Sequence, residues 1–211
     1  MAVTYSQNGV IVRNTGFDVI GGKKYKIARM PDGKIWLAEN LDFKFCTIGG
    51  SGTPTTANAW YYNNDETTYG WSGYKCGLLY NWYAIKFLND NRSELCPGWH
   101  VPTSNEWSTL ATSCGGSIIA GGKLKALDGS FGTNWPSNWN GTNNYEFNII
   151  PTGGRLTDGS FQDINSVGSF WTIDMNNNDA INIYLLNNSD ELYYSSYELI
   201  VGTALRLVRD A

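Results

Sequence analysis

The spacing of apolar residues predicts a pair of strands near the start of this chain. The stretch FDVIGGKKYKIARMPDGKIWLAENL begins at Phe17, and apolar residues alternate with polar ones on both sides of its PDGK sequence. Alternation of this kind around a Pro-Asp-Gly turn is typical of two antiparallel strands. We therefore expect one strand before the turn and one after it, with their apolar positions at Tyr25, Ile27, Ile35 and Leu37.

Apolar residues at helical spacing follow in the middle of the chain. The segment LLYNWYAIKFLND, at 78–90, predicts a helix. A second helix is predicted in VPTSNEWSTLATSCGG, where Thr103 is an N-cap, Glu106 is its capping-box partner and Gly115 ends the helix. The segment AGGKLKAL predicts a short helical turn that is interrupted by glycine.

From Phe147 onward the pattern changes to short strands separated by polar turns. These strands are FNIIP, FWTID, AINIYLL, ELYYSSY and ALRLV. Helices followed by strands predict an α+β fold with a curled antiparallel sheet. We find no internal repeat, and we interpret CTIGGSGTPTTANAW, at 46–60, as a long surface loop. The expected organisation is an arm or first strand at 1–20 and one domain at 21–211.

Composition excludes several classes of function. Only 16% of the residues are charged, the net charge is −4, and lysine and arginine form no cluster, so a nucleic-acid-binding protein is not expected. No apolar run reaches 18 residues, so no membrane span is expected. The opening MAVTYSQNGVIVRN lacks a basic segment and an apolar segment, so we expect no signal peptide.

The residues that most often carry catalysis are few. His100 is the only histidine, and we interpret it as a packed, hydrogen-bonded residue. The four cysteines have no C-x-x-C spacing, which argues against structural zinc and leaves disulfides and buried thiols both open. Cys96 and Cys114, beside the second helix, are interpreted as a core thiol or a disulfide. We therefore expect no enzyme.

Polar loops offer further candidate sites. YYNNDETTYG, at 61–70, is rich in oxygen ligands, so structural calcium is a minor alternative to a solvated turn. PTGGR lacks the ending of a phosphate-binding loop, and we expect a tight turn at Gly153 and Gly154. Arg206 and Arg209 fit an anion site, but arginine in a closing strand more often bonds carbonyls or carboxylates of the scaffold.

Several motifs together resemble a known family. IWLAENLDF, GLLYNWYAI, CPGWHVPTSNEW, YEFNIIPTGGRLTDGSF, SFWT and ALRLVRD resemble, in order and spacing, the Fibrobacter-type major paralogous domain family over about residues 25–210. The resemblance implies a C-type-lectin-like fold, which formylglycine-generating enzymes share. In such a fold two helices pack on a twisted antiparallel sheet, and loops at one face carry the binding site.

The segment at 171–209 resembles something narrower, the variable region of diversity-generating retroelement variable proteins. Trp171, Thr172, Asn176 to Asn178, AINIYL and LRLVR follow the order of that region. Asn, Asp, Ser, Tyr and Ile are the residues that adenine-directed mutation of Asn codons readily produces. The resemblance therefore implies a diversified ligand-binding face.

The predicted strand AINIYLL divides this segment into two faces. Ile181, Ile183 and Leu185 would face the core, and Asn182 and Tyr184 would face outward. Asn, Ser and Tyr are also the residues of adaptable recognition loops, whereas ordinary β-turns explain part of the Asn and Asp content. The candidate ligand-binding residues are Ile173, Asp174, Asn176, Asn177, Asn178, Asn182, Tyr184, Asn187, Asn188, Asp190, Tyr193, Tyr194, Ser195 and Tyr197.

These observations favour a non-enzymatic recognition protein, either in phage or prophage receptor binding or in adhesion at a bacterial surface. The expected ligand is a cell-surface protein or a glycan, and the expected location is a virion or the bacterial surface. A homotrimer with the N-terminal arm as an assembly element suits this role. The alternative is a secreted glycan-binding domain of fixed specificity that uses Trp60, Tyr61, Tyr62 and Trp71. An oxidase related to formylglycine-generating enzymes ranks below both.

Overall fold

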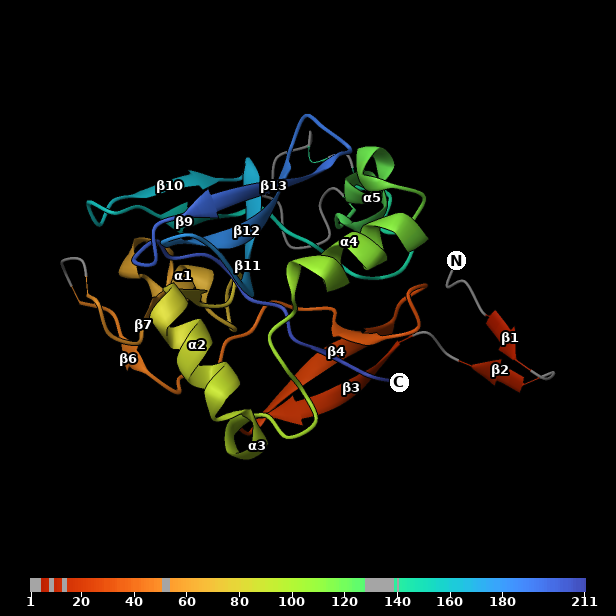
Figure 1. Cartoon of the computed structure of the whole chain (residues 1–211), viewed down its shortest axis with the longest axis horizontal. Helices are drawn as coiled ribbons and strands as arrows, with labels where there is room; N and C mark the ends of the chain where they lie inside the picture. Colours follow the sequence, from red (N-terminus) through yellow and green to blue (C-terminus); the bar gives the residue numbers. More distant parts are fainter. Residues whose placement is uncertain (1–4, 8–9, 13–14, 51–53, 128–138, 140) are drawn as a thin grey trace.

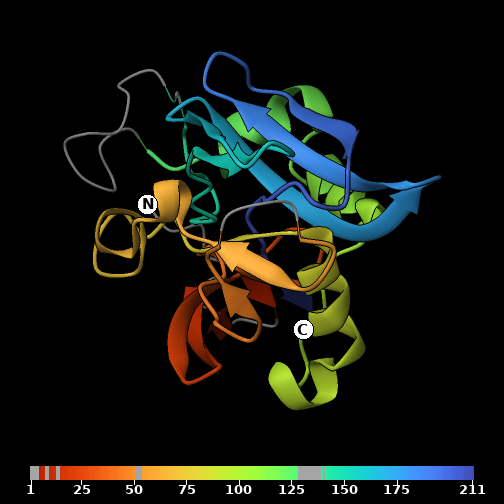
Figure 2. The ribbon, with the colours of Figure 1, turned by 90° about the vertical axis from the view of Figure 1, so that its left-hand side faces the viewer.

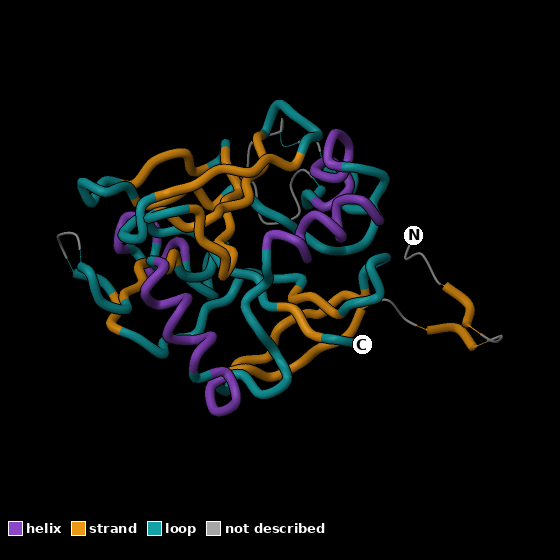
Figure 3. Tube along the Cα trace, viewed as in Figure 1, coloured by secondary structure: helices purple, strands orange, loops and turns teal. Residues whose placement is uncertain are grey.

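The computed structural model of the chain describes residues 5–7, 10–12, 15–50, 54–127, 139 and 141–211. Within these residues the fold is mixed α+β, with strands in several small sheets, helices packed against them and long connecting loops (Figures 1 and 3). The predicted α+β class is confirmed.

One sheet brings the two ends of the domain together. It contains β3 (Thr15–Ile20), β4 (Lys23–Arg29), β5 (Ile35–Leu37) and β14 (Val208–Arg209) in the antiparallel order β14-β5-β4-β3. The PDGK turn joins β4 to β5 as predicted, and the Lys34 carbonyl accepts a hydrogen bond of 2.9 Å from the Met30 amide. A separate hairpin precedes the sheet, formed by β1 (Tyr5–Gln7) and β2 (Val10–Val12). Part of the expected N-terminal arm therefore belongs to the sheet.

The helices follow the predicted sequence signals with shifted boundaries. They are η1 (Tyr62–Asn64), α1 (Glu66–Tyr69), α2 (Trp82–Asp90), α3 (Arg92–Leu95), α4 (Ser104–Ser113) and α5 (Ser117–Leu124). The prediction of a helix from residue 78 was wrong, because Asn81 caps α2 and residues 79–80 form β8 instead. Helix α4 has the predicted capping box: the Thr103 hydroxyl accepts from the Glu106 amide, and the Glu106 carboxylate accepts from the Thr103 amide. No helix in the described ranges has the length and apolar character that a bilayer crossing needs.

The remaining strands form three further sheets. These contain β6 (Thr47–Ile48), β7 (Asn58–Trp60) and β8 (Leu79–Tyr80), then β9 (Thr152–Arg155) and β10 (Phe161–Ile164), and finally β11 (Val167–Asn176), β12 (Asp179–Leu186) and β13 (Leu192–Tyr197). FNIIP contributes only an isolated bridge at Ile149, and ALRLV contributes a bridge at Ala204 and the start of β14. Both were predicted as full strands.

The predicted tight turn at Gly153 and Gly154 is also wrong, because both lie in β9. Gly153 has a φ of +62°, and a Cβ there would lie 2.3 Å from the Gln162 carbonyl oxygen of β10. Glycine is required at this position by the close approach of the two strands, in a conformation that other residues rarely adopt.

Buried tryptophans hold two adjoining cores. In one, Trp36 packs on Trp107 with ring centroids 4.9 Å apart, and Trp107 packs on Phe170 at 5.6 Å. The other core contains Trp82, Trp99 and Trp171. Each of these five tryptophans is buried. Figure 2 shows that α4 and α5 lie behind one face of the β11–β13 sheet.

Candidate functional site

Strand β11 bends away from its partner close to helix α4. The register with β12 is interrupted between Trp171 and Met175. Within the interruption the Thr172 hydroxyl donates a hydrogen bond of 2.9 Å to the Ile181 carbonyl, and the Ile173 amide donates one of 3.0 Å to the Pro102 carbonyl. The bent strand is thereby attached to the segment that leads into α4.

Asp174 completes this attachment. Its carboxylate accepts hydrogen bonds from the amide and the hydroxyl of Ser104, at 2.7 and 2.6 Å. Ser104 is the first residue of α4, where backbone amides lack partners within the helix and the helix dipole favours negative charge. Asp174, a candidate ligand-binding residue, therefore holds the end of α4 against β11.

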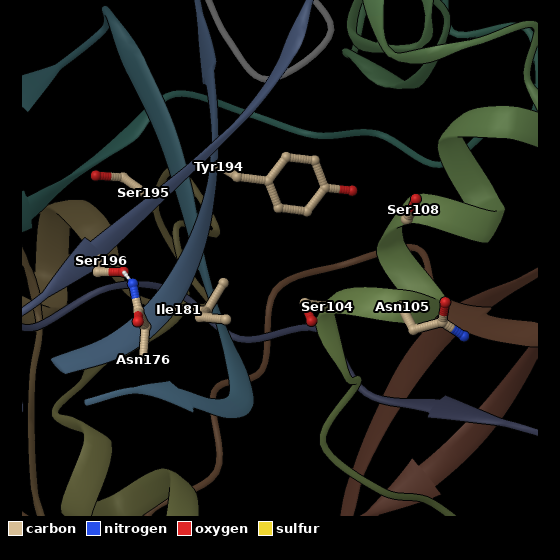
Figure 4. A pocket seen from close by; sticks show the side chains of 8 residues that line it. All are labelled: Ser104, Asn105, Ser108, Asn176, Ile181, Tyr194, Ser195 and Ser196. Carbon is tan, nitrogen blue, oxygen red and sulfur yellow. Dashed lines mark hydrogen bonds between the residues drawn. The ribbon is translucent and has the colours of Figure 1, made fainter. Parts of the chain in front are cut away.

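A groove opens between the first half of α4 and the sheet. Its volume is about 470 Å³, within the range that small ligands occupy. Figure 4 shows the side chains that line it, three from the helix and five from the strands. They are Ser104, Asn105, Ser108, Asn176, Ile181, Tyr194, Ser195 and Ser196.

The chemistry of the groove is polar and uncharged. Tyr194 is 43% exposed, and its ring points across the groove toward Ser108 (Figure 4). Burial raises the pKa of the Tyr194 phenol, and the neighbouring Ser108 hydroxyl offsets part of the rise, so the phenol is neutral at pH 7. Asn176 donates a long hydrogen bond of 3.4 Å to the Ser196 hydroxyl. The groove therefore offers neutral donors and acceptors beside the apolar Ile181.

The structure brings only some of the predicted site residues to this groove. Asn176, Tyr194 and Ser195 line it. Asn177 and Asn178 form the exposed β11–β12 turn next to Asn176, and Asn177 has a φ of +55°, a conformation that asparagine tolerates well. The predicted site residues at this end of the sheet therefore form one continuous surface.

Other predicted residues lie at the opposite end of the same sheet. Asn187, Asn188 and Asp190 belong to the β12–β13 turn, and the eight residues of β12 separate the two ends by about 26 Å. This turn is attached to the rest of the domain through Lys125, whose ammonium group donates to the carbonyls of Leu186 and Ser189. The predicted residues therefore do not form a single face.

The expected outward orientation of Asn182 is wrong. Asn182 is fully buried, its amide oxygen accepts from the Ser169 hydroxyl at 2.8 Å, and its amide nitrogen donates to the Thr203 hydroxyl at 3.3 Å. Both faces of β12 are covered, because Ile183 and Leu185 belong to one buried core while Ala180, on the same face as Asn182, belongs to the other.

Three tyrosines and one isoleucine of the predicted site contribute to the scaffold. Tyr184 and Tyr193 stack with ring centroids 5.1 Å apart, and Tyr197 meets Trp171 edge to face at 6.3 Å. Ile173 packs partly buried against the same core as Trp171.

The helix side of the groove was missed by the sequence analysis. Ser104 and Ser108 are spaced four residues apart, so they share one face of α4 and both line the groove with Asn105. The signal was present as the polar TSNEWS start of the helix, but it was interpreted only as a capping motif. Ile181, expected in the core, is half-buried at the groove.

The single histidine is part of the helix cap, as expected for a structural residue. His100 Nε2 lies 2.8 Å from a carboxylate oxygen of Glu106. Burial raises the pKa of Glu106, but its bonds with His100 and Thr103 outweigh burial and leave the pKa at about 2. The carboxylate is therefore ionised at neutral pH.

The four cysteines, all within the described residues, are free. Burial raises the pKa of the Cys96 and Cys114 thiols to about 11 and of Cys46 and Cys76 to about 12. Thiols of such high pKa are protonated at neutral pH and are weak nucleophiles.

The loop considered for calcium uses its carboxylates locally. Asp65 caps α1 by accepting from the Thr68 amide, and Glu66 pairs with Lys44 at 2.7 Å. In the described part of the chain no three His, Cys, Asp or Glu side chains are placed to hold a metal ion.

The aromatic platform of the alternative hypothesis is mostly inaccessible. Trp60, Tyr61 and Tyr62 are buried, and only Trp71 is partly exposed. The Arg155 guanidinium lies 4.1 Å from the centroid of the Trp60 ring. Stacking of a sugar on Trp60 is therefore excluded in this conformation.

Comparison with known families agrees with the motifs of the sequence. The model of the Fibrobacter succinogenes major domain matches residues 32–209. The chain belongs to this family. Comparisons with curated proteins and with solved structures find no match. All eight groove residues lie inside the matched range, so the groove belongs to the Fibrobacter major domain itself.

The closing arginines of the Fibrobacter major domain stabilise its scaffold. Arg206 is buried, and its guanidinium donates to the carbonyls of Leu37, Phe147 and Asn148. The Arg209 guanidinium lies 3.4 Å from the Asp18 carboxylate. The expectation that these arginines bond carbonyls and carboxylates of the scaffold is confirmed.

Proposed function

We propose that this Fibrobacter major domain is a non-enzymatic ligand-recognition protein whose binding site is the groove between α4 and β13. The observation that carries the proposal is the groove lining, which combines neutral hydrogen-bonding groups with Tyr194 and Ile181. Tyrosine gives a large contact area with few rotatable bonds, and Ser and Asn give adaptable hydrogen bonds. The protonated thiols and the placement of His100 in the helix cap support binding over an oxidase activity.

The proposal includes a C-type-lectin-like scaffold and a diversified binding face. Two features support it: helices α4 and α5 pack on a three-stranded antiparallel sheet, and the sequence order at 171–209 resembles the variable region of retroelement-diversified proteins. Asn176 to Asn178 and Tyr194 are exposed, so substitution there leaves the core unchanged. The proposed variable positions are thus the groove and the β11–β12 turn.

The proposed setting is receptor binding by a phage or prophage, or adhesion at a bacterial surface, with a cell-surface protein or glycan as ligand. A virion or the bacterial surface is the corresponding location. A homotrimer is the proposed assembly, with the β1–β2 hairpin that precedes the family domain as the assembly element.

Binding of labelled protein to a panel of bacterial cells and to a glycan array tests the groove. Tyr194→Ala removes the side chain that reaches across the groove, and Ser108→Arg fills the groove. We expect each substitution to weaken binding by at least about tenfold. Asn188→Ala, at the opposite end of the sheet, is the matched control and should bind as the wild type does. Unchanged binding in both groove variants would refute the proposal.

Sequences of the same gene from many isolates test diversification separately. We expect substitutions to concentrate at Asn176, Asn177, Tyr194 and Ser195, beside a near-identical template and a reverse transcriptase gene. Asp174 and Asn182 should stay constant, because their bonds hold the scaffold. Equal constancy at all of these positions would leave a binder of fixed specificity.

A further inference from the structure

Strand β13 forms one edge of its sheet, because the strand order is β11-β12-β13. On the opposite edge, residue 204 bonds to β11: the Ala204 amide donates to the Ser169 carbonyl at 3.0 Å, and the Trp171 amide donates to the Ala204 carbonyl at 3.2 Å. The backbone groups of Ser169 and Trp171 therefore point away from β12.

This orientation fixes the direction of every backbone group across the sheet. Ser169 lies opposite Tyr184, so these two form a non-hydrogen-bonded pair, and the backbone groups of Tyr184 point to β13. There Tyr184 pairs with Tyr193, so Tyr193 uses its backbone groups toward β12. Because alternate residues of a strand point their backbone groups to opposite sides, those of Tyr194 and Ser196 point outward from the sheet edge.

The outward groups of Tyr194 and Ser196 have no backbone partner among the described residues. Helix α5 packs beside β13, and its Gly122 amide bonds the Asp190 carbonyl just before the strand begins. Natural edge strands are usually protected by lysine, proline, a bulge or a covering segment. The sequence of β13, LYYSSY, contains no lysine and no proline, and no described segment forms backbone hydrogen bonds with the outward groups of its second half.

This open edge is continuous with the groove. Ser195 pairs with the buried Asn182, so its side chain belongs to the sheet face turned away from α4, and Figure 4 shows it pointing away from the groove. Tyr194 and Ser196, which carry the outward backbone groups of the edge, both line the groove. A ligand in the groove therefore meets the main chain of β13 as well as the side chains of α4.

We propose that the ligand is an extended polypeptide segment, which binds by adding to β13 as a further strand of the sheet. This inference rests on the groove function proposed above and specifies its ligand class. A row of outward N–H and C=O groups matches the backbone of another extended chain, which is the basis of recognition by strand addition. Alternate side chains of the segment would enter the groove, with Tyr194 of β13 on one side and Ser104 and Ser108 of α4 on the other. The uncharged lining there favours small, uncharged residues.

The experiment begins with a displayed library of random 12-residue peptides selected against the wild-type protein. Binders are synthesised, and their affinities are measured by calorimetry. Ser196→Pro removes one outward amide without removing a bond to β12, so the strand is expected to survive. We expect Ser196→Pro to weaken binding by about tenfold and Ser196→Ala, which keeps the amide, by less than about threefold.

A second measurement does not depend on the folding of the proline variant. Single N-methyl groups are placed along the selected peptide, and we expect loss of affinity at every second position only, because alternate peptide amides face β13. Hydrogen exchange of the wild type should show slower exchange at the Tyr194 and Ser196 amides when the peptide binds.

Failure of this inference is distinguishable from failure of the groove. If N-methylation shows no alternation, or if the library yields no binder while a glycan binds in a Tyr194-dependent manner, the groove function stands and the strand-addition inference is refuted. If neither the peptide nor the glycan responds to Tyr194→Ala or Ser108→Arg, both are refuted.

Discussion

Replacement of Asn182 by alanine should destabilise the fold strongly, although the residue belongs to a segment rich in exposed asparagine. The substitution removes the bonds to the Ser169 and Thr203 hydroxyls, each worth about 1 kcal/mol net. Both hydroxyls are buried, at 4% and 1% exposure, so a partner left unsatisfied adds a cost of about 1 kcal/mol or more. With a small cavity in addition, the expected loss is about 2 to 4 kcal/mol.

Urea denaturation followed by tryptophan fluorescence measures this loss, and thermal melting checks it. A loss of about 2 to 4 kcal/mol lowers the melting temperature by roughly 4 to 16 °C for a chain of this size. Asn178→Ala is the control, because Asn178 is exposed in the β11–β12 turn. If the free energies of unfolding of the two variants agree within about 0.5 kcal/mol, Asn182 is not part of the scaffold and the reasoning is refuted.

Three further predictions follow from the same scaffold and are checked by urea denaturation. Asp174→Ala should cost about 2 kcal/mol through loss of two charge-assisted bonds at the helix start, whereas the exposed Glu198→Ala should change stability by less than about 0.5 kcal/mol. The folded-state pKa of Glu106 lies at about 2, below its ordinary 4.5. The stability that the ionised carboxylate adds to the folded state is therefore complete above pH 4.5 and is lost as the pH falls toward 2. Glu106→Gln should therefore be less stable than the wild type at pH 7 and lose less stability on acidification; equal acid sensitivity would contradict this. Trp107→Ala should cost about 3 to 5 kcal/mol, whereas Asn177→Gly should be nearly neutral because glycine adopts a positive φ freely, and similar losses in the two would contradict the assignment.

Local signals predicted the local parts of the fold correctly. The capping box at Thr103 and Glu106 and the PDGK turn are made by residues within four positions of each other, so their geometry is encoded in a few neighbouring residues. The strand AINIYLL was also predictable, because alternation over seven residues is a strong signal for a strand.

The burial of Asn182 could not be predicted in the same way. Alternation separates two faces of a strand, but it does not reveal that both are covered. The covering residue Thr203 lies 21 positions away in sequence, in a segment that itself lacks strand regularity. Likewise Asp174 meets Ser104 across 70 positions, so the groove between them is a property of the tertiary fold.

The bonds that build the groove and the residues that line it are largely separate. Asp174, Thr172 and Asn182 hold the strands and α4 in place through short bonds to partners in the scaffold. In the lining, the Asn176 side chain makes two long bonds, with Ser196 at 3.4 Å and with Asn177 at 3.3 Å, and Tyr194 points across the groove toward Ser108.

This separation has a consequence for recognition by strand addition. The hydrogen bonds offered by the edge of β13 come from the main chain and do not depend on which side chains the strand carries. Specificity, in contrast, depends on the side chains that line the groove. A change at Tyr194 or Ser196 would therefore alter which segment binds while the backbone pairing that supplies affinity is kept. Such an arrangement suits a binding face that must change its ligand without changing its fold.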